Sequence, residues 1–349
     1  MDDFTMNLRF RSAGDTLSLL SKYIKQAGIS RLADLSYLDD TSDLKIFSAI
    51  RPNAKSITVS MGKSIHKDEA QCAALMESIE TYFAEEVKPG IINVSQEDLA
   101  NNHDLFVNLN KQDFSATVLN KQSLDWCLGR TLISNKEIYI PHIALSLDSN
   151  LLLSRIFGQN SDGIASGSNY KEALIYSFLE LIERNSTRIS QKKQLEHVEC
   201  DIFRFTDMSK ISTSFYFYEN IFNLPVIESN ILNSNPLNNQ SVVAGYSCHF
   251  SKHEAVMKAY IEAIQSKVGI ISGARDDLDQ SCYNFSKLKT LTQIPEKIYF
   301  ESLNSSNLSL VQQFDQIVKL LNHNNKDLAV YSYLNEDICI LKTFLINNE

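Results

Sequence analysis

Hydrophobic and polar residues follow two different periods along this chain, one typical of helices and one of strands. Apolar side chains recur every three or four positions over several long stretches. This pattern predicts long helices at about 67–86, 170–190 and 253–269. Shorter helices are expected at about 16–27 and 308–322.

Short runs rich in β-branched and aromatic residues predict strands between these helices. The expected strands lie at about 56–60, 131–145, 225–232, 241–248, 297–303, 328–334 and 338–345. Helices and strands are mixed along the chain, and no run of Pro and Gly marks a clean boundary. We therefore expect an α+β fold with a single domain over residues 1–349. An N-terminal lobe over residues 1–55 is the alternative division.

The composition restricts the compartment and the partners. The 42 acidic and 33 basic residues give a net charge of -9, which does not favour a nucleic-acid surface. The longest apolar runs are too short to cross a bilayer, and the N-terminus lacks the apolar stretch of a signal peptide. The six cysteines form no CxxC pair, which is typical of a reducing compartment. We expect a cytoplasmic protein with no nucleic-acid or membrane partner.

Carboxylates share a helix face with small residues on all three long helices. The residues that lie three positions apart, and so on one face, are Glu77 and Glu80, Glu180 and Glu183, and Glu262 and Gln265. A carboxylate on such a face must be paired, hydrogen-bonded or bound to a metal, because burying a bare charge is very costly. Ordinary solvent-facing acids are the alternative, but the repetition on three helices argues against it. The pattern predicts a site for Mg²⁺, which prefers oxygen ligands and often binds substrate phosphates too.

Loops beside these helices carry groups that suit phosphates. Ser60-Met61-Gly62-Lys63-Ser64 leads into the first helix, so that backbone N–H groups and Lys63 could meet a nucleotide. The spacing is not that of a Walker A loop. Arg184 and Lys258 lie close to the acids in the sequence, and Arg275 belongs to a charged turn after the third helix. That turn is either part of a nucleotide site or a capped, solvated turn.

Together these segments resemble the YcaO family of ATP-dependent, peptide-modifying enzymes. The stretches that carry the resemblance are VSMGKSIHKDEAQCAALMESIETYFAEE, SDGIASGSNYKEALIYSFLELIERNS and GYSCHFSKHEAVMKAYIEAIQSKVGIISGARDD. Their order and spacing match over most of the chain, from about Arg9 onward. The resemblance implies a YcaO-type fold, with mixed sheets and long acidic helices that line a site for ATP and Mg²⁺.

The resemblance also implies roles for individual residues. The expected metal-handling acids are Glu77, Glu80, Glu180, Glu183 and Glu262. From the loops and the resemblance together, the residues expected to contact ATP are Arg9, Thr16, Ser60, Lys63, Ser168, Glu172, Arg184, Lys258, Gln265 and Arg275. No catalytic residue is assigned. Lys258 and Lys267 stand where the family has arginine, so their phosphate contacts are expected to be weaker.

The reaction that the resemblance implies is activation of a peptide backbone amide by phosphorylation of its oxygen. The products left open are a thioamide from sulfide, an azoline from an internal Cys, Ser or Thr, and an amidine from an amine. The upstream run with Asp39, Asp40 and Ala49-Ile50-Arg51-Pro52 is most similar to YcaO proteins that form thioamides with a TfuA partner. A thioamide synthetase is therefore the first expectation, an azoline-forming cyclodehydratase of a ribosomally made peptide the second, and a non-catalytic nucleotide- or peptide-binding scaffold the third.

The expected partners follow from this reaction. One is a precursor peptide or protein substrate. Another is a TfuA-like or E1-like protein that presents the peptide or delivers sulfide, because a bare active-site groove offers few contacts to offset the ordering of a disordered peptide. A homodimer is left open.

Overall fold

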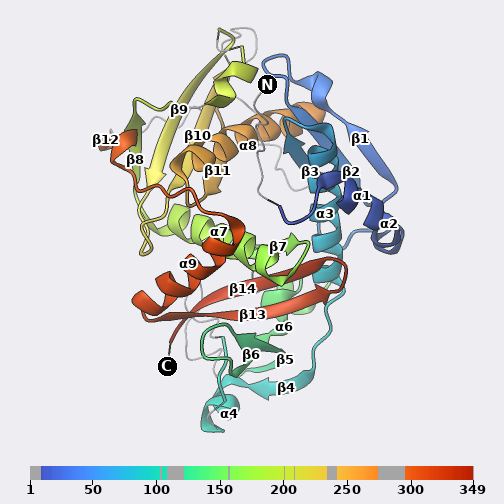
Figure 1. The fold of residues 1–349 in the computed structure, drawn as a ribbon. Coiled ribbons are helices and arrows are strands. Elements are labelled where there is room, and N and C mark those ends of the chain that lie inside the picture. Colours follow the sequence, from blue (N-terminus) through green and yellow to red (C-terminus); the bar gives the residue numbers. More distant parts are fainter. Residues whose placement is uncertain are drawn as a thin grey trace. The chain divides into compact units, whose positions relative to one another are not determined.

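In the computed structural model the chain forms long helices and three sheets in an α+β arrangement (Figure 1). The structure describes residues 9–102, 104–107, 122–155, 158–199, 201–207, 209–233, 242–273 and 295–348. The contacts divide the chain into two units. Unit 1 comprises Met1–Asn53, Ile57–Ile79 and Ile182–Gln313, and unit 2 comprises Ala54–Ser56, Glu80–Leu181 and Phe314–Glu349. The single domain expected from the sequence stays a prediction.

Unit 1 contains two sheets. The smaller is antiparallel, in the order β1 (Arg31–Asp34), β2 (Lys45–Ile50), β3 (Val59–Ser64). The larger has the order β11 (Val242–Cys248), β10 (Val226–Asn233), β9 (Ile211–Tyr218), β8 (Lys192–Glu196), β12 (Lys297–Tyr299). Strand β12 pairs in parallel with β8 while the other pairs are antiparallel, so this sheet is mixed as expected.

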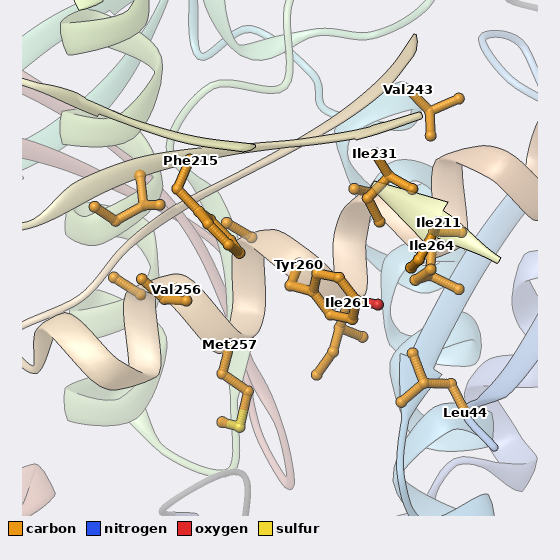
Figure 2. Close-up of a cluster of buried hydrophobic side chains, with 14 of the residues drawn as sticks. Leu44, Ile211, Phe215, Ile231, Val243, Val256, Met257, Tyr260, Ile261 and Ile264 are labelled. Atoms are coloured by element: carbon orange, nitrogen blue, oxygen red, sulfur yellow. The ribbon is translucent and has the colours of Figure 1, made fainter. Parts of the chain in front are cut away.

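Helix α8 (Lys252–Ser272) covers one face of the larger sheet and forms the core of unit 1 with it (Figure 2). Val256, Tyr260 and Ile264 come from one side of the helix, as a period of 3.6 residues requires. They pack in one cluster with Phe215 of β9 and Ile231 of β10. Short helices α1 (Ala13–Leu19) and α2 (Ser21–Ala27) precede β1.

Unit 2 is built on the remaining sheet. Its strand order is β4 (Ile91–Ser95), β5 (Ser123–Thr131), β13 (Lys326–Asn335), β14 (Cys339–Asn347), β7 (Ile164–Gly167), and β6 (Glu137–Pro141) pairs with β5. Its shorter helices are α4 (Gln96–Asn101), α6 (His142–Leu145) and most of α9 (Leu310–His323). The long helices α3 (Lys67–Glu85) and α7 (Tyr170–Ile189) contribute residues to both units. Among the described residues, no helix has both the length and the apolarity needed to cross a bilayer.

The long helices lie where the sequence predicts them, but several shorter elements differ. The predicted helix at 16–27 is two helices that meet at Leu20, and Gly28 closes the second in the left-handed region with φ 69°. The predicted strand region at 131–145 is only partly right: it contains β6 and the last residue of β5, two strands that pair with each other, but its final residues form α6. Strands not predicted at all are β1, β2, β4, β7, β8 and β9.

Candidate functional site

Two glycines let the strands of unit 1 lie directly against acid-bearing helices. A Cβ atom at Gly62 of β3 would lie 2.1 Å from the carbonyl oxygen of Ala70 in α3. A Cβ atom at Gly245 of β11 would lie 2.2 Å from the backbone nitrogen of Ala263 in α8. Only glycine fits such close approaches, and they fix the positions of residues next to these glycines relative to the helices.

Lys63 and Glu262 form the ion pair at the centre of the candidate site. The Lys63 ammonium on β3 donates to the Glu262 carboxylate on α8 over 3.1 Å. Both side chains are about one-quarter exposed, at 27% and 26%, so a ligand can reach them. Burial of this degree keeps the electrostatic attraction stronger than at an open surface.

Glu183 of α7 is a buried acid in the same region. Burial, together with the neighbouring Glu262 carboxylate, raises the pKa of Glu183 to about 7. Arg184, Lys63 and the backbone N–H of Cys248 act in the opposite direction. The Arg184 Nε lies 3.6 Å from the Glu183 carboxylate. Glu183 and Glu262 therefore repel each other, and a bound cation would relieve this repulsion.

Cations also gather around Lys258 of α8. Burial lowers the pKa of Lys258 to about 8, and the positive charges of Arg9 and Lys63 add to this effect, while Glu254 opposes it. Three positive side chains from separate segments of unit 1 therefore repel one another there. A polyanion such as a triphosphate would relieve that repulsion.

Gln265 provides an independent sign that a ligand belongs in this region. It lies one turn after Glu262 on α8, and its Oε1 atom is buried without a hydrogen-bond partner among the described residues. A buried polar atom of this kind costs free energy unless something binds it. The carboxylates, the cations and this amide oxygen together fit a nucleotide with Mg²⁺.

The other predicted residues of unit 1 occupy different surroundings. Glu77 of α3 is half-buried and accepts a hydrogen bond of 3.2 Å from the N–H of Met61, beside the buried Ser60. Thr16 of α1 donates to the carbonyl of Ser12 over 2.9 Å. Arg275 lies outside the described residues. The nucleotide roles of Ser60 and Thr16 and the metal role of Glu77 stay predictions.

Lys267 of α8 is paired with residues upstream of β2. Its ammonium is buried and donates to Asp39 over 3.0 Å and to Thr41 over 3.3 Å. Asp39 belongs to the upstream run that resembles TfuA-associated proteins. In the structure this residue is an internal partner of α8. These contacts satisfy the buried Lys267 ammonium within the chain.

Unit 2 contains the remaining predicted residues. Ser168 donates to the buried Glu172 carboxylate from its N–H over 3.1 Å and from its hydroxyl over 2.5 Å. These bonds fix the start of α7. Glu80 and Glu180 are half-buried on α3 and α7. Across the described residues, no group of three or more His, Cys, Asp or Glu side chains is close enough to hold a metal ion, so the metal roles stay predictions.

Two buried charges of this fold are not predicted from the sequence. Lys342 of β14 donates hydrogen bonds to the carbonyls of Ala144 and Asn160. Burial lowers the pKa of Lys342 to about 8, while the negative charges of Asp162 and Glu180 act to raise it. In unit 1, Glu228 of β10 is 3% exposed. A lone charge inside an apolar, strand-like run was the available signal in both cases. The partners of Glu228 are Lys192, at 2.8 Å, and the Tyr218 hydroxyl, which donates to it.

Comparison with known proteins decides the family. Residues 61–341 match a family model described as YcaO cyclodehydratase, ATP- and Mg²⁺-binding. The chain belongs to the YcaO family. ATP and Mg²⁺, the cofactors predicted from the sequence, are confirmed as the ligands of this family.

Solved structures confirm the fold. The structure of YcaO from Methanopyrus kandleri bound with AMPPCP and Mg²⁺ has a TM-score of 0.71 at 15% identity, covering 97% of this chain and 91% of that one. The E. coli microcin synthetase McbBCD complex contains a chain with a TM-score of 0.62 at 14% identity, covering 91% of this chain and 87% of that one. The α+β, YcaO-type fold predicted from the sequence is therefore confirmed.

Two curated relatives are similar at the sequence level. One is an uncharacterized protein encoded in the tfuA 3′ region of Rhizobium leguminosarum bv. trifolii, 25% identical over 288 residues that cover 77% of this chain and 68% of the relative. The other is an uncharacterized protein of Mycobacterium tuberculosis, 25% identical over 303 residues that cover 81% of this chain and 66% of the relative. This YcaO chain thus spans about two thirds of the length of each.

Proposed function

We propose that this YcaO protein activates a peptide backbone amide by phosphorylating its oxygen, and that the product is a thioamide. The observation that carries the proposal is the ion pair of Lys63 and Glu262 beside the buried Glu183. This group contains a cation that can bind a triphosphate and, next to it, acids that can bind Mg²⁺. In the net reaction a peptide amide, ATP and sulfide give a thioamide, ADP and phosphate.

In unit 1, the basic residues and the acidic residues have different roles. When bound, ATP supplies the phosphoryl group that makes the amide oxygen a leaving group, and Mg²⁺ offsets charge on its phosphates. Arg9, Lys63 and Lys258 hold the phosphates by direct attraction. Glu183 and Glu262 would hold the Mg²⁺ ion. Gln265 Oε1 accepts a hydrogen bond from the nucleotide or its water.

The choice of sulfide as nucleophile rests on two observations. One relative of this chain is encoded in the tfuA 3′ region. In addition, the upstream run with Asp39 and Asp40 resembles YcaO proteins that form thioamides with a TfuA partner. Both observations support a sulfur-delivering partner more than an internal nucleophile.

A second protein is part of this proposal. The E. coli microcin synthetase is described as a complex of several proteins, and one of its structures has pro-MccB17 bound. We propose a TfuA-like or E1-like protein as the partner and a peptide or protein as the substrate. A partner that presents the peptide reduces the ordering cost that a disordered substrate otherwise incurs on binding.

Reconstitution tests the proposal. The purified protein is mixed with a candidate substrate peptide, ATP, Mg²⁺ and sulfide, with and without a TfuA-like protein. A gain of about 16 Da in peptide mass marks oxygen-to-sulfur exchange, and a loss of about 18 Da marks an azoline. The gain is expected, and only with the partner. The loss would make the protein a cyclodehydratase, and unchanged peptide with full ATP binding would support a non-catalytic scaffold.

A further inference from the structure

In the part of the chain that the structure describes, strand β11 forms one edge of the larger sheet. Among the described residues it is the terminal strand of that sheet and pairs only with β10. The exposed edge of a strand presents a row of backbone N–H and C=O groups to which another extended chain can pair. This edge belongs to the same unit as the ion pair of Lys63 and Glu262.

One hydrogen bond shows which backbone groups point outward. The N–H of His249 donates to the carbonyl of Pro225 over 3.1 Å, so His249 is directed toward the β10 side. Backbone direction alternates along an antiparallel strand, and Ser247 and Gly245 therefore also face β10. The N–H and C=O groups of Cys248, Tyr246 and Ala244 point to the open edge.

The first position on this edge lies beside an acid of the candidate site. The backbone N–H of Cys248 is close enough to the Glu183 carboxylate to favour its charged form. The next outward groups belong to Tyr246 and Ala244, and no described residue forms a hydrogen bond with their backbone there. Both residues are half-buried, and Val242 further along is 46% exposed. The edge thus leads from the surface directly to Glu183.

We propose that an extended segment of the peptide substrate pairs with the open edge of β11 at Ala244 and Tyr246, which places its backbone beside Glu183. This inference rests on the proposed function, since it names how that site holds its substrate. Pairing to an edge strand recognises the backbone, which is the group that the reaction changes, and tolerates different side chains.

The geometry of strand pairing has a consequence for the modification. Every second amide of an added strand forms hydrogen bonds to the edge, and the others point away from it. A carbonyl that is engaged with β11 is shielded from phosphorylation, whereas one that points away is accessible. In any one register, therefore, only alternate amides can react.

A proline substitution tests the edge directly. Ala244→Pro removes the outward N–H but no hydrogen bond of the sheet, and an edge strand accepts proline at such a position. Ala244→Thr is the matched control, since it keeps the N–H and suits a strand. The probe is a set of fluorescent, end-capped peptides of about eight residues. They are selected from randomised sequences for binding to the full chain with AMPPCP and Mg²⁺.

We expect Ala244→Pro to weaken peptide binding about three- to tenfold for the lost hydrogen bond, and Ala244→Thr to leave it within about twofold. A melting temperature near that of the wild type and unchanged AMPPCP affinity show that the fold and the nucleotide site are intact. Equal peptide affinity for both variants, or a selection that yields no binder, overturns the proposal. Absence of AMPPCP binding to the wild type would instead overturn the proposed function.

A second measurement keeps the proposal testable if the proline variant fails to fold. Single N-methyl groups are placed in turn along the tightest peptide, and each affinity for the wild-type chain is measured. Because an N-methyl group removes a donor and adds bulk, binding should weaken at every second position. Equal weakening along the whole peptide, or weakening at one position alone, contradicts pairing with β11.

Discussion

The ammonium of Lys63 and the carboxylate of Glu262 lie 3.1 Å apart, although 199 positions separate the two residues in the sequence. The pair joins β3, which belongs to the smaller sheet of unit 1, to α8, which covers the larger one. Each partner stays about one-quarter exposed. Exposure of this degree leaves both side chains accessible to a ligand.

Lys63→Met tests the phosphate-binding role of this pair. Loss of one charged hydrogen-bond donor should weaken AMPPCP binding with Mg²⁺ about 10- to 100-fold, measured by calorimetry. Lys193→Met is the matched control, because Lys193 is exposed to a similar degree, at 22%, and also contacts a glutamate, Glu219, at 2.8 Å, but does not belong to the candidate site. Affinity that is unchanged in Lys63→Met would remove Lys63 from the nucleotide site.

Glu183→Gln should stabilise the ligand-free protein at alkaline pH. The folded-state pKa of Glu183, about 7, is raised above its ordinary value of 4.5, so stability is lost as the pH rises between these values. The glutamine variant has no such loss. In metal-free buffer at a pH near 8 we expect it to melt roughly 3–6 °C above the wild type, with the difference vanishing below the ordinary pKa. Lower stability at alkaline pH would make Glu183 a structural partner of Arg184 or Lys63.

The effect of Asp39→Asn on stability should depend on pH in the opposite direction to that of Glu183→Gln. Burial acts to raise the pKa of Asp39, but hydrogen bonds from Ser42, Thr41 and Lys267 outweigh it and lower the pKa from 3.8. The stabilisation is therefore complete above that value and is lost as the pH falls through the folded-state pKa. At neutral pH the variant should lose about 3 kcal/mol of unfolding free energy, because it leaves the Lys267 charge buried.

Denaturant unfolding at neutral and acidic pH measures this difference. Lys297→Met serves as the control. The ammonium of Lys297 lies 2.8 Å from the Glu196 carboxylate, a distance similar to that of the Lys267–Asp39 pair, but the Lys297 side chain is 57% exposed. A loss in Asp39→Asn no greater than in the control would show that the buried pair contributes little.

Gly245→Ala tests the close approach of β11 to α8. The added Cβ would lie 2.2 Å from a backbone nitrogen that cannot move without shifting the helix. We expect a loss of about 2–4 kcal/mol in unfolding free energy from such overpacking. Gly14→Ala is the control, since nothing lies within 4 Å of its added Cβ and α1 should gain slightly in helix propensity. Equal stability of both variants would contradict the contact.

Local patterns explain which parts of the fold could be predicted. Helices α3, α7 and α8 extend over 19, 20 and 21 residues, long enough for the 3.6-residue period to be recognised. Strands such as β1 and β7 have only four residues each, and their role depends on neighbours far away in the sequence.

The candidate site shows the same limit. The acids on the helices could be identified from their spacing, but the sequence does not say which of them meet. Glu183 of α7 interacts with Glu262 of α8, and Lys267 pairs with Asp39, although both pairs are far apart in the sequence. Such contacts depend on tertiary packing, which residue spacing does not encode.

The fate of the amide oxygen tests the central claim most directly. A substrate peptide with ¹⁸O in its backbone carbonyls is incubated with the protein, its partner, ATP, Mg²⁺ and sulfide, and the released phosphate is analysed by mass spectrometry. If the amide oxygen is phosphorylated, each modification transfers one ¹⁸O atom into the phosphate. Modified peptide accompanied by unlabelled phosphate would contradict the account.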